Sequence, residues 1–189
     1  MGQVVVSEFM TLDGVVEDPG GAEGFERGGW AFEFARGEDG DQFKLDEVMA
    51  AGALLLGRRT YEGFAAAWPG RTDDVGFAEK FNNMPKYVVS STLTEPEWKN
   101  SHVLGDDLTA EVNWLRDTID GDVLVNGSVE LVNALAAAGL IDELRLMVFP
   151  VVLGTGKRLF ADGAEKTPLK LTHSQAVGDG VVILTYRPV

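Results

Sequence analysis

The chain has 189 residues, of which 30 are acidic and 16 basic, for a formal net charge of −14 at pH 7. Hydrophobic residues make up 45% of it and charged residues 24%, as in ordinary globular domains. The acidic balance argues against nucleic acid as a partner, because a phosphate backbone needs a basic surface. The sequence has no cysteine, which excludes disulfides, thiolate metal sites and a cysteine nucleophile.

Neither a secretory signal nor a membrane span is expected. The N-terminal stretch MGQVVVSEFM lacks a basic region followed by a long apolar one, and no segment supplies about 18 uninterrupted apolar residues. We therefore expect a cytoplasmic protein without a membrane partner. A chain of this length is expected to form one domain, covering residues 1–189.

Short β-rich runs alternate with helical patterns, which is typical of βαβ units and a mainly parallel sheet. The runs at 54–56 and 123–125 have no polar alternation, which predicts strands buried on both faces. An Asp-Gly turn within 177–182 predicts a closing antiparallel hairpin. The predicted strands cover residues 4–9, 53–57, 87–91, 122–126, 144–149, 169–177 and 181–187.

Apolar residues at helical spacing predict helices between these strands. The predicted helices cover residues 42–51, 60–67, 74–82, 106–119 and 128–138. The stretch 18–42 is irregular and rich in glycine and aromatic residues. It could form the wall of a binding pocket, with Trp30 and Phe34 as substrate contacts, or it could form a satellite cluster or an oligomer contact.

Three points where a predicted strand ends have the chemistry to hold one anionic ligand. In the first, LLLGRRTYE (54–62), Gly57 precedes a helix that begins with Arg58, Arg59 and Thr60. A helix N-terminus offers free amides and the positive end of the dipole, and arginine adds charge-assisted hydrogen bonds to phosphate.

Two arginines are unfavourable in the first turn of a helix, because the dipole is positive there. A negative partner is therefore expected for the pair. It could be a ligand phosphate, or it could be a carboxylate of the chain, such as Glu62 or Asp73.

The second point, YVVSSTL (87–93), ends in hydroxyls, and Ser90 and Ser91 could donate to a phosphate or only cap a turn. The third, VLVNGSVEL (123–131), passes from a strand through Asn126, Gly127 and Ser128 into a helix, where exposed amides could hold a pyrophosphate. No dinucleotide fingerprint, Walker loop or serine-hydrolase elbow is present, and the two histidines have no metal-site spacing, so no metal is expected.

Five motifs, in this order and spacing, resemble the dihydrofolate reductase fold superfamily. The resemblance is closest to the group named for the C-terminal reductase domain of the bifunctional riboflavin-biosynthesis deaminase-reductase, the RibD C-terminal domain. It implies an α/β fold of three layers, α/β/α, with NADPH along the carboxyl ends of a mainly parallel central sheet. The motifs are MTLDGVV (10–16), LLLGRRTYE (54–62), YVVSSTL (87–93), LVNGSVELVNALAAAGLIDEL (124–144) and PVVLGTGKRLF (150–160).

By position, the resemblance implies that Arg58, helped by Ser91, meets the adenosine 2′-phosphate of NADPH. Arg59 and Thr60 would contact the pyrophosphate or its flanks. Gly127, Ser128 and Val129 would support the pyrophosphate from the second helix.

The resemblance also places MTLDGVV beside the nicotinamide and the substrate, with Asp13 and Val16 at that end. Asp13 is the first choice for a proton donor, although LDG could also be only a turn that leaves the first strand. The two glycines of the family before the second helix are Asn126 and Gly127 here. An irregular backbone at that place would therefore have to be made with Asn126.

The expected function is an NADPH-dependent oxidoreductase that transfers a hydride to a small heterocyclic or conjugated substrate. One alternative is the 5-amino-6-(5-phosphoribosylamino)uracil reductase of riboflavin biosynthesis. Its substrate phosphate needs a second basic site, for which Lys157 and Arg158 are candidates unless they are only solvated charges.

Two further alternatives stay open. Dihydrofolate reductase activity would need an acidic anchor, for which Glu33, Asp46 and Glu47 are candidates that no spacing distinguishes. The chain could also be a non-catalytic nucleotide-binding homodimer. A homodimer is expected from the resemblance in any case, and MVFPVVLG (147–154) could supply its contact or be buried within one subunit.

Overall fold

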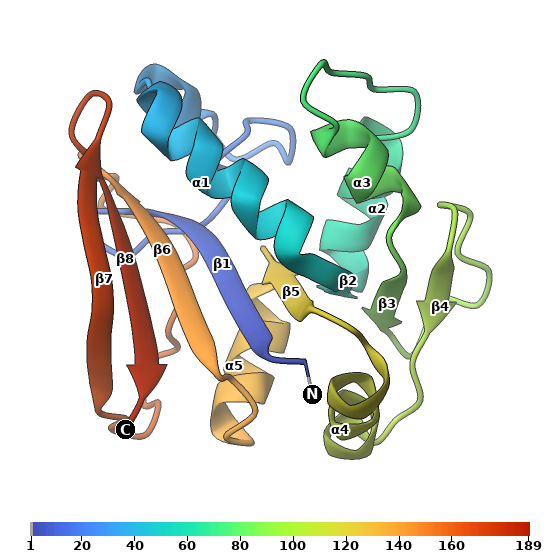
Figure 1. The fold of residues 1–189 in the computed structure, drawn as a ribbon. Coiled ribbons are helices and arrows are strands. Elements are labelled where there is room, and N and C mark those ends of the chain that lie inside the picture. Colours follow the sequence, from blue (N-terminus) through green and yellow to red (C-terminus); the bar gives the residue numbers. More distant parts are fainter. Residues whose placement is uncertain (1) are drawn as a thin grey trace.

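The computed structural model describes residues 2–189, which contain one eight-stranded sheet in the order β4-β3-β2-β5-β1-β6-β8-β7. The six strands from β4 to β6 run parallel, whereas β8 is antiparallel to β6 and β7 is antiparallel to β8 (Figure 1). The predicted mainly parallel sheet with a C-terminal antiparallel hairpin is therefore confirmed.

The strands are β1 (Val4–Thr11), β2 (Ala51–Gly57), β3 (Lys86–Val89), β4 (Ser101–Val103), β5 (Asp122–Asn126), β6 (Glu143–Phe149), β7 (Leu169–Val177) and β8 (Val181–Pro188). The helices are α1 (Gly37–Ala50), α2 (Arg58–Ala67), α3 (Phe77–Asn83), α4 (Leu108–Thr118) and α5 (Val129–Ala137), preceded by a short 3₁₀ turn, η1 (Trp30–Glu33). No helix within residues 2–189 has the length and apolar character that a membrane crossing requires.

Helices α1, α2 and α3 cover one face of the sheet, and α4 and α5 cover the other (Figure 1). Neighbouring residues of one strand are therefore buried in two different cores. Val5 packs with residues of α1, α2 and α3, whereas Val4 and Val6 pack with residues of α4 and α5. This arrangement explains the apolar runs without alternation and confirms the three-layer fold.

A third buried cluster lies over β6 and β8 and includes Trp30, Phe149 and Ile183. Part of the apolar stretch 147–154 belongs to this cluster, because Met147 and Phe149 are buried in it and Val151 and Leu153 pack against it. Pro150, Val152 and Gly154 are exposed, and Val152 is 63% exposed. The stretch therefore combines core residues with exposed ones.

The largest departures from the predicted elements are at two places. Strand β4 was not predicted, because its three residues at the sheet edge are too few to show a period-two pattern. Helix α1 begins at Gly37 instead of residue 42. Its first half is acidic and it buries only Gly40, Glu47 and Val48, so the apolar stripe that marks a helix is nearly absent.

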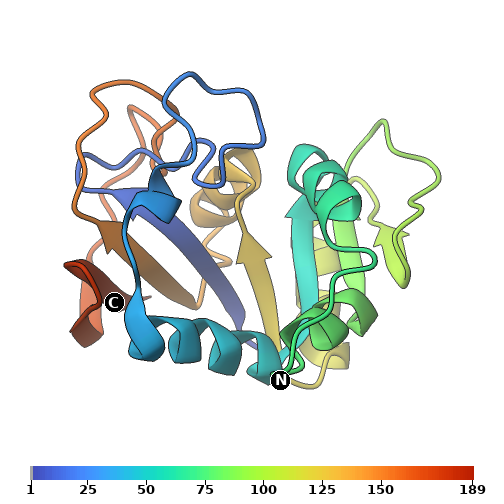
Figure 2. The same cartoon turned by 90° about the horizontal axis from the view of Figure 1, so that it is seen from above.

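The parallel strands end at one edge of the sheet. In Figure 2 the arrowheads of β1, β2 and β5 point to this edge, and the long loops that follow β1 and β6 rise beside it. An isolated bridge between Val15 and Arg158 joins these two loops. Helices α2 and α5 begin at the same edge, and ligands of open α/β sheets bind at this end of the strands.

Candidate functional site at the carboxyl edge of the sheet

Two helix N-termini are tied together at this edge by the hydroxyl of Ser128. Its Oγ accepts a hydrogen bond from the amide of Gly57 (2.9 Å) and lies 2.9 Å from Thr60 Oγ1, to which it donates. Neither α2 nor α5 has a side-chain cap at its N-terminus. The first-turn amides of both helices are therefore free to bind a shared anion.

The turn that leads into α5 has an unusual backbone. Gly127 and Ser128 both have left-handed dihedrals, with φ of 58° and 59°. A Cβ added at Gly127 would lie 3.1 Å from the Thr60 side chain, so a larger residue there would have to displace Thr60 slightly. A left-handed serine costs about 1–2 kcal/mol, and such strain is typical of ligand-binding turns.

The irregular backbone was expected at Asn126, and this expectation is wrong. Asn126 is the last residue of β5, and the left-handed residue next to Gly127 is Ser128. Asn126 instead donates from its Nδ2 to the carbonyl of Ser7 at 3.0 Å. It thereby joins β5 to β1 at the place where their main-chain pairing ends.

The arginine pair is only partly neutralised. Arg58 donates to both carboxylate oxygens of Glu62, at 2.9 and 3.0 Å, and its side chain is 41% exposed. Asp73 does not compensate it, because Asp73 accepts hydrogen bonds from the amides of α3 and the turn before it. Arg59 is exposed and forms no ion pair with any described residue.

An exposed ion pair one helical turn apart is worth only a few tenths of a kcal/mol. A bound phosphate can therefore replace Glu62 as the partner of Arg58 at little cost. The amides of α2, Arg58 and Arg59 together provide positive potential in a protein that is acidic as a whole.

The two serines after β3 have different roles. Ser90 Oγ accepts hydrogen bonds from the amides of Thr92 (3.2 Å) and Leu93 (3.0 Å), so it caps a turn. Ser91 is exposed beside it. The Ser90 hydroxyl only accepts in this turn, so both hydroxyls keep an O–H that can donate to a ligand.

Strand β1 has an open edge beyond the end of β5. It pairs with β5 only as far as Ser7, whereas its pairing with β6 continues to Thr11. Main-chain groups of alternate residues face opposite neighbours, so the amide and carbonyl of Phe9 point to the β5 side, as those of Ser7 do. Within residues 2–189 they find no main-chain partner there, which leaves a donor and an acceptor side by side.

Asp13 does not have the properties of a proton donor. Its carboxylate accepts hydrogen bonds from the hydroxyl of Thr11 (2.7 Å) and the amides of Gly154 (2.8 Å) and Leu153 (3.2 Å). The bond from Thr11 contributes most to lowering the pKa of Asp13 to about 2. The group is therefore ionised at neutral pH, and it joins the loop after β1 to the loop after β6.

The aromatic residues expected to contact substrate belong to the core instead. Trp30 is 1% exposed, its indole N–H donates to the carbonyl of Glu17 (2.9 Å), and its ring centroid lies 5.4 Å from that of Phe149. Phe34 is half-buried and packs against the same Phe149 ring. A Gly-rich loop gives no periodic signal for burial, so the sequence could not separate these two roles.

The remaining predicted residues lie along the same edge. Val16 is buried in the core beneath α5, and Val129 is half-buried at the first position of that helix. Lys157 is exposed, and its amide donates to Glu17. The guanidinium of Arg158 donates to the carbonyl of Asp13.

Sequence reasoning missed Glu8, which lies in β1 immediately after the last residue paired with β5. It is buried, and its Oε1 has no hydrogen-bond partner in the described part of the chain. The main chain of Gly127 lies close enough to favour its ionised form, but burial outweighs this and raises the pKa of Glu8 well above its usual value. The signal was present, because an acidic residue inside a strand buried on both faces is exceptional.

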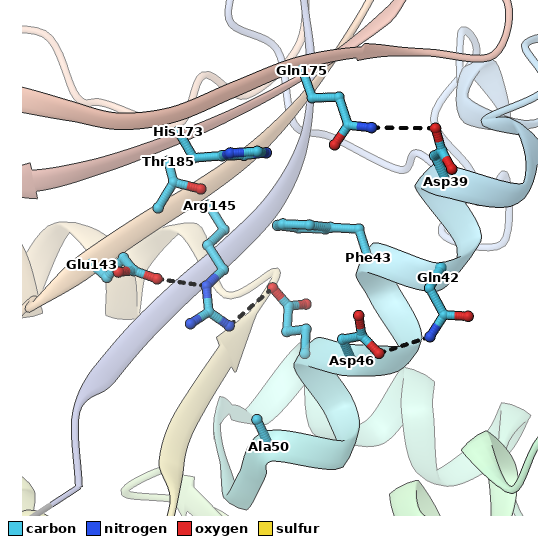
Figure 3. Close-up of a pocket in the computed structure, with 11 residues that line it drawn as sticks. Asp39, Gln42, Phe43, Asp46, Ala50, Glu143, Arg145, His173, Gln175 and Thr185 are labelled. Atoms are coloured by element: carbon cyan, nitrogen blue, oxygen red, sulfur yellow. Dashed lines mark hydrogen bonds and ion pairs between the residues drawn. The ribbon is translucent and has the colours of Figure 1, made fainter.

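A hollow lies elsewhere, between α1 and the strands β6, β8 and β7 (Figure 3). Its volume is about 610 Å³, and its lining includes Asp39, Asp46, Glu47, Glu143, Arg145 and His173. Arg145 is its one arginine, and three carboxylates neutralise it: Glu143 at 2.6 Å, Asp122 at 3.2 Å and Glu47 at 3.7 Å. This acidic groove is unsuited to a phosphate ligand.

The carboxylates considered for a folate anchor are engaged or exposed. Glu33 is exposed on η1, and Asp46 accepts a hydrogen bond from Gln42 in the groove of Figure 3. Glu47 is the buried member of the set, and Lys44 and Arg145 both pair with it. The folate alternative therefore has no carboxylate among its three candidates that is both buried and unpaired.

Comparisons with known proteins agree with this geometry. The uncharacterized protein YyaP of Bacillus subtilis (strain 168) is 28% identical over 188 residues, covering 98% of this chain and 94% of YyaP. A structure from Shewanella sp. PV-4, with a provisional assignment to riboflavin biosynthesis, has a TM-score of 0.79 at 20% identity, covering 100% of this chain and 99% of that one.

The dihydrofolate reductase of Enterococcus faecalis, complexed with NADP(H), has a TM-score of 0.58 at 18% identity, covering 99% of this chain and 96% of the reductase. At such identities the structural likenesses show the fold. The sequence comparison reaches further, because the family described as the RibD C-terminal domain matches residues 3–183. This chain belongs to the RibD C-terminal domain family.

Proposed function

We propose that this protein is an NADPH-dependent reductase that transfers a hydride to a small heterocyclic or conjugated substrate. The observation that carries the proposal is the pair of uncapped helix N-termini joined through Ser128 at the carboxyl edge of the sheet. Family membership and the NADP(H)-bound reductase with the same fold support the same cofactor.

The residues present suit a dinucleotide with an additional phosphate. Arg58 and Ser91 would hold the 2′-phosphate, because an arginine and an exposed hydroxyl are typical phosphate ligands. Arg59, Thr60 and the amides of the Gly127–Val129 turn would hold the pyrophosphate. The steric closeness of Gly127 to Thr60 supports this assignment, since it brings both helix ends to one anion.

The open edge of β1 would orient the redox ring. A planar carboxamide carries one donor and one acceptor, and it can pair with the free amide and carbonyl of Phe9. The cofactor supplies the hydride when bound, whereas the protein binds it, orients it and excludes water. Asp13 would fix the loops beside the substrate, because its ionised carboxylate is committed to three hydrogen bonds.

Nucleotide binding tests this proposal directly. Quenching of tryptophan fluorescence would be titrated with NADPH and with NADH, for the wild type and for Arg58→Ala. We expect NADPH to bind about tenfold or more tightly than NADH, and Arg58→Ala to remove most of that preference. Lys170→Ala is the matched control, because it removes one positive charge from β7, the edge strand that lies farther from β2 and α2.

Lys170→Ala could lower NADPH affinity as much as Arg58→Ala does. The loss would then come from the overall electrostatic potential of the protein, and the 2′-phosphate assignment would fail. If neither nucleotide binds in the micromolar range to folded wild type, the proposed function fails.

Within the same class, reduction of 5-amino-6-(5-phosphoribosylamino)uracil is the second candidate. Its support is the family and the exposed Lys157 beside Arg158, on the loop that carries the Asp13 contacts. Isothermal titration of this substrate against wild type and Lys157→Ala tests it. Loss of binding only in the variant supports a second phosphate site, and no binding to the wild type rejects this substrate.

A nucleotide-binding homodimer without turnover is the remaining alternative. Light scattering after size-exclusion chromatography measures the subunit number, and a substrate screen with NADPH oxidation as readout measures turnover. Oxidation of NADPH that depends on an added substrate would reject the non-catalytic reading.

A further inference from the structure

Glu8 is a buried carboxyl group without a complete set of partners. The residue is 5% exposed, and its Oε1 makes no hydrogen bond to any of residues 2–189. Burying a carboxyl group without its hydrogen-bond partners costs folding free energy, so its presence needs an explanation.

The position of Glu8 connects it to the proposed anion-binding turn. The pairing of β1 with β5 ends at Ser7 and Asn126, so Glu8 and Gly127 are the next residues along the two neighbouring strands. The side chains of alternate β1 residues share a face, which places Glu8 with Val4 and Val6 on the α5 side. The carboxyl and the start of α5 are therefore neighbours.

The charges around Glu8 do not neutralise it. Lys44 and Glu47 act on it from α1, and Glu23 acts on it from the loop after β1. Lys44 is already engaged, because it donates to Glu47 and to Ser7 Oγ at 2.8 Å. Lys44 is therefore already hydrogen-bonded elsewhere, whereas Glu47 and Glu23 both place negative charge near Glu8.

Burial has the largest effect on Glu8 and raises its pKa well above the usual value. Lys44 and the main chain of Gly127 act in the opposite direction, and Glu47 and Glu23 add to the rise. The neutral form is thereby favoured, and the cost of a buried charge next to the turn is avoided.

We propose that Glu8 is a positioning residue for the anion held at the Gly127–Ser128 turn, and that this anion binds only while the Glu8 carboxyl carries its proton. The inference rests on the proposed function, since the anion is the pyrophosphate of NADPH. An ionised Glu8 would place a negative charge in the apolar core directly behind the turn. It would repel the phosphates and compete for the amide of Gly127.

The pH profile of binding tests this inference. The dissociation constant of NADPH would be measured from pH 6 to 9.5 for the wild type and for Glu8→Gln, which is uncharged at every pH. We expect wild-type affinity to fall at least tenfold more than that of Glu8→Gln across this range, while both agree at pH 6. Dividing the wild-type dissociation constant at each pH by that of Glu8→Gln removes the effect of titrating NADPH and surface groups.

Glu23→Gln is the matched control, because it removes an exposed carboxylate from the same neighbourhood and leaves Glu8 in place. Because Glu23 adds to the rise in the pKa of Glu8, this variant should keep the wild-type fall in affinity but begin it at slightly lower pH. A flattened profile in Glu23→Gln, or equal profiles in wild type and Glu8→Gln, would overturn the inference while NADPH binding itself still supports the proposed function.

A second measurement avoids the variants, in case Glu8→Gln does not fold. Carbon-13 NMR of the side-chain carboxyls would follow the titration of Glu8 in wild-type protein with and without NADPH. Because linkage is reciprocal, bound NADPH must raise the pKa of Glu8. An unchanged or lowered pKa with NADPH bound contradicts the inference. Absence of NADPH binding at pH 6 removes both the inference and the proposed function.

Discussion

Two groups of arginines in this protein have opposite surroundings. Arg145, beside the large groove under α1, is surrounded by three carboxylates and is mostly buried. Arg58 and Arg59, at the start of α2, have one exposed carboxylate between them and lie where the helix dipole is already positive.

The difference shows why the groove under α1 is not the best candidate for the binding site. In that groove, carboxylates of the protein itself pair with the positive charge of Arg145 (Figure 3). The pKa of Glu143 reflects the same pairing. Burial raises the pKa of Glu143, but hydrogen bonds and charges of Arg145 and Arg187 outweigh burial and lower it. At the carboxyl edge, positive potential remains available to a ligand.

Replacing Arg145 should have the largest effect on stability. Arg145→Met leaves Glu47, Glu143 and Asp122 without their shared cation, and breaking such a buried pair costs about 3–5 kcal/mol of unfolding free energy. Urea denaturation measures this loss. NADPH affinity measured well below the denaturation midpoint should be unchanged, and a loss of affinity would show that the two regions are coupled.

Lys86 makes the comparison more specific, because it is a buried cation that has no carboxylate partner among residues 2–189. Its ammonium donates to the carbonyls of Asn82 and Lys99 and lies 4.1 Å from the ring centroid of Trp98. Burial lowers its pKa from 10.5 to about 8.

Between these two pKa values the unfolded chain binds a proton that the folded protein does not bind. This group therefore makes stability rise with pH in the window from about 8 to 10.5. Relative to Lys86→Met, the wild type should gain up to about 3 kcal/mol across the window. Urea denaturation of both proteins at several pH values measures the gain, and parallel stability curves would contradict it.

Comparing Gly127→Ala with its control, Gly139→Ala, separates the effect of backbone strain from the effect of steric crowding at the site. Both have positive φ, 58° and 65°, but a Cβ at Gly139 would meet nothing within 4 Å. Gly127→Ala and Gly139→Ala should each lower stability by about 1 kcal/mol. Only Gly127→Ala should weaken NADPH binding, by about tenfold, because it pushes Thr60 and the α2 terminus away. Equal affinities for the two variants would reject a shared anion site.

The smallest effect is expected from Glu62. Glu62→Gln removes the carboxylate that competes for Arg58, while stability should change by no more than about 0.5 kcal/mol. NADPH should then bind about twofold more tightly, and NADH affinity should stay the same. A large loss of stability would show that the Arg58–Glu62 pair is structural.

Much of the fold was predictable because its strongest signals are local. The apolar runs around Leu55 and Leu124 are long enough to show burial on both faces, and the Asp179–Gly180 turn identifies the hairpin. Strand β4 and the start of α1 carry weak signals and were missed. In both, packing against the rest of the molecule decides the structure.

The sequence predicted where the site lies in the fold, but it did not predict the contacts within the site. The sequence predicted α2 and α5 to begin beside their strands, but it could not decide whether Glu62 or a phosphate pairs with Arg58. The tie between Ser128 and Gly57 is invisible in sequence, because these residues are brought together only by the sheet. Trp30 was misassigned for the same reason, since its burial depends on Phe149.

The position of β1 in the sheet has a consequence for the order of folding. Its neighbours, β5 and β6, come from the second half of the chain, whereas the hairpin of β7 and β8 joins residues close in sequence. During synthesis, β1 emerges first and must stay unpaired until Asn126 has been made. Contacts between such distant segments form slowly, because their loop-closure entropy is paid before any pairing is gained. The open edge at Phe9 therefore comes into existence only once β1 has paired with β5 and β6, and acquisition of full nucleotide affinity should mark the last stage of refolding.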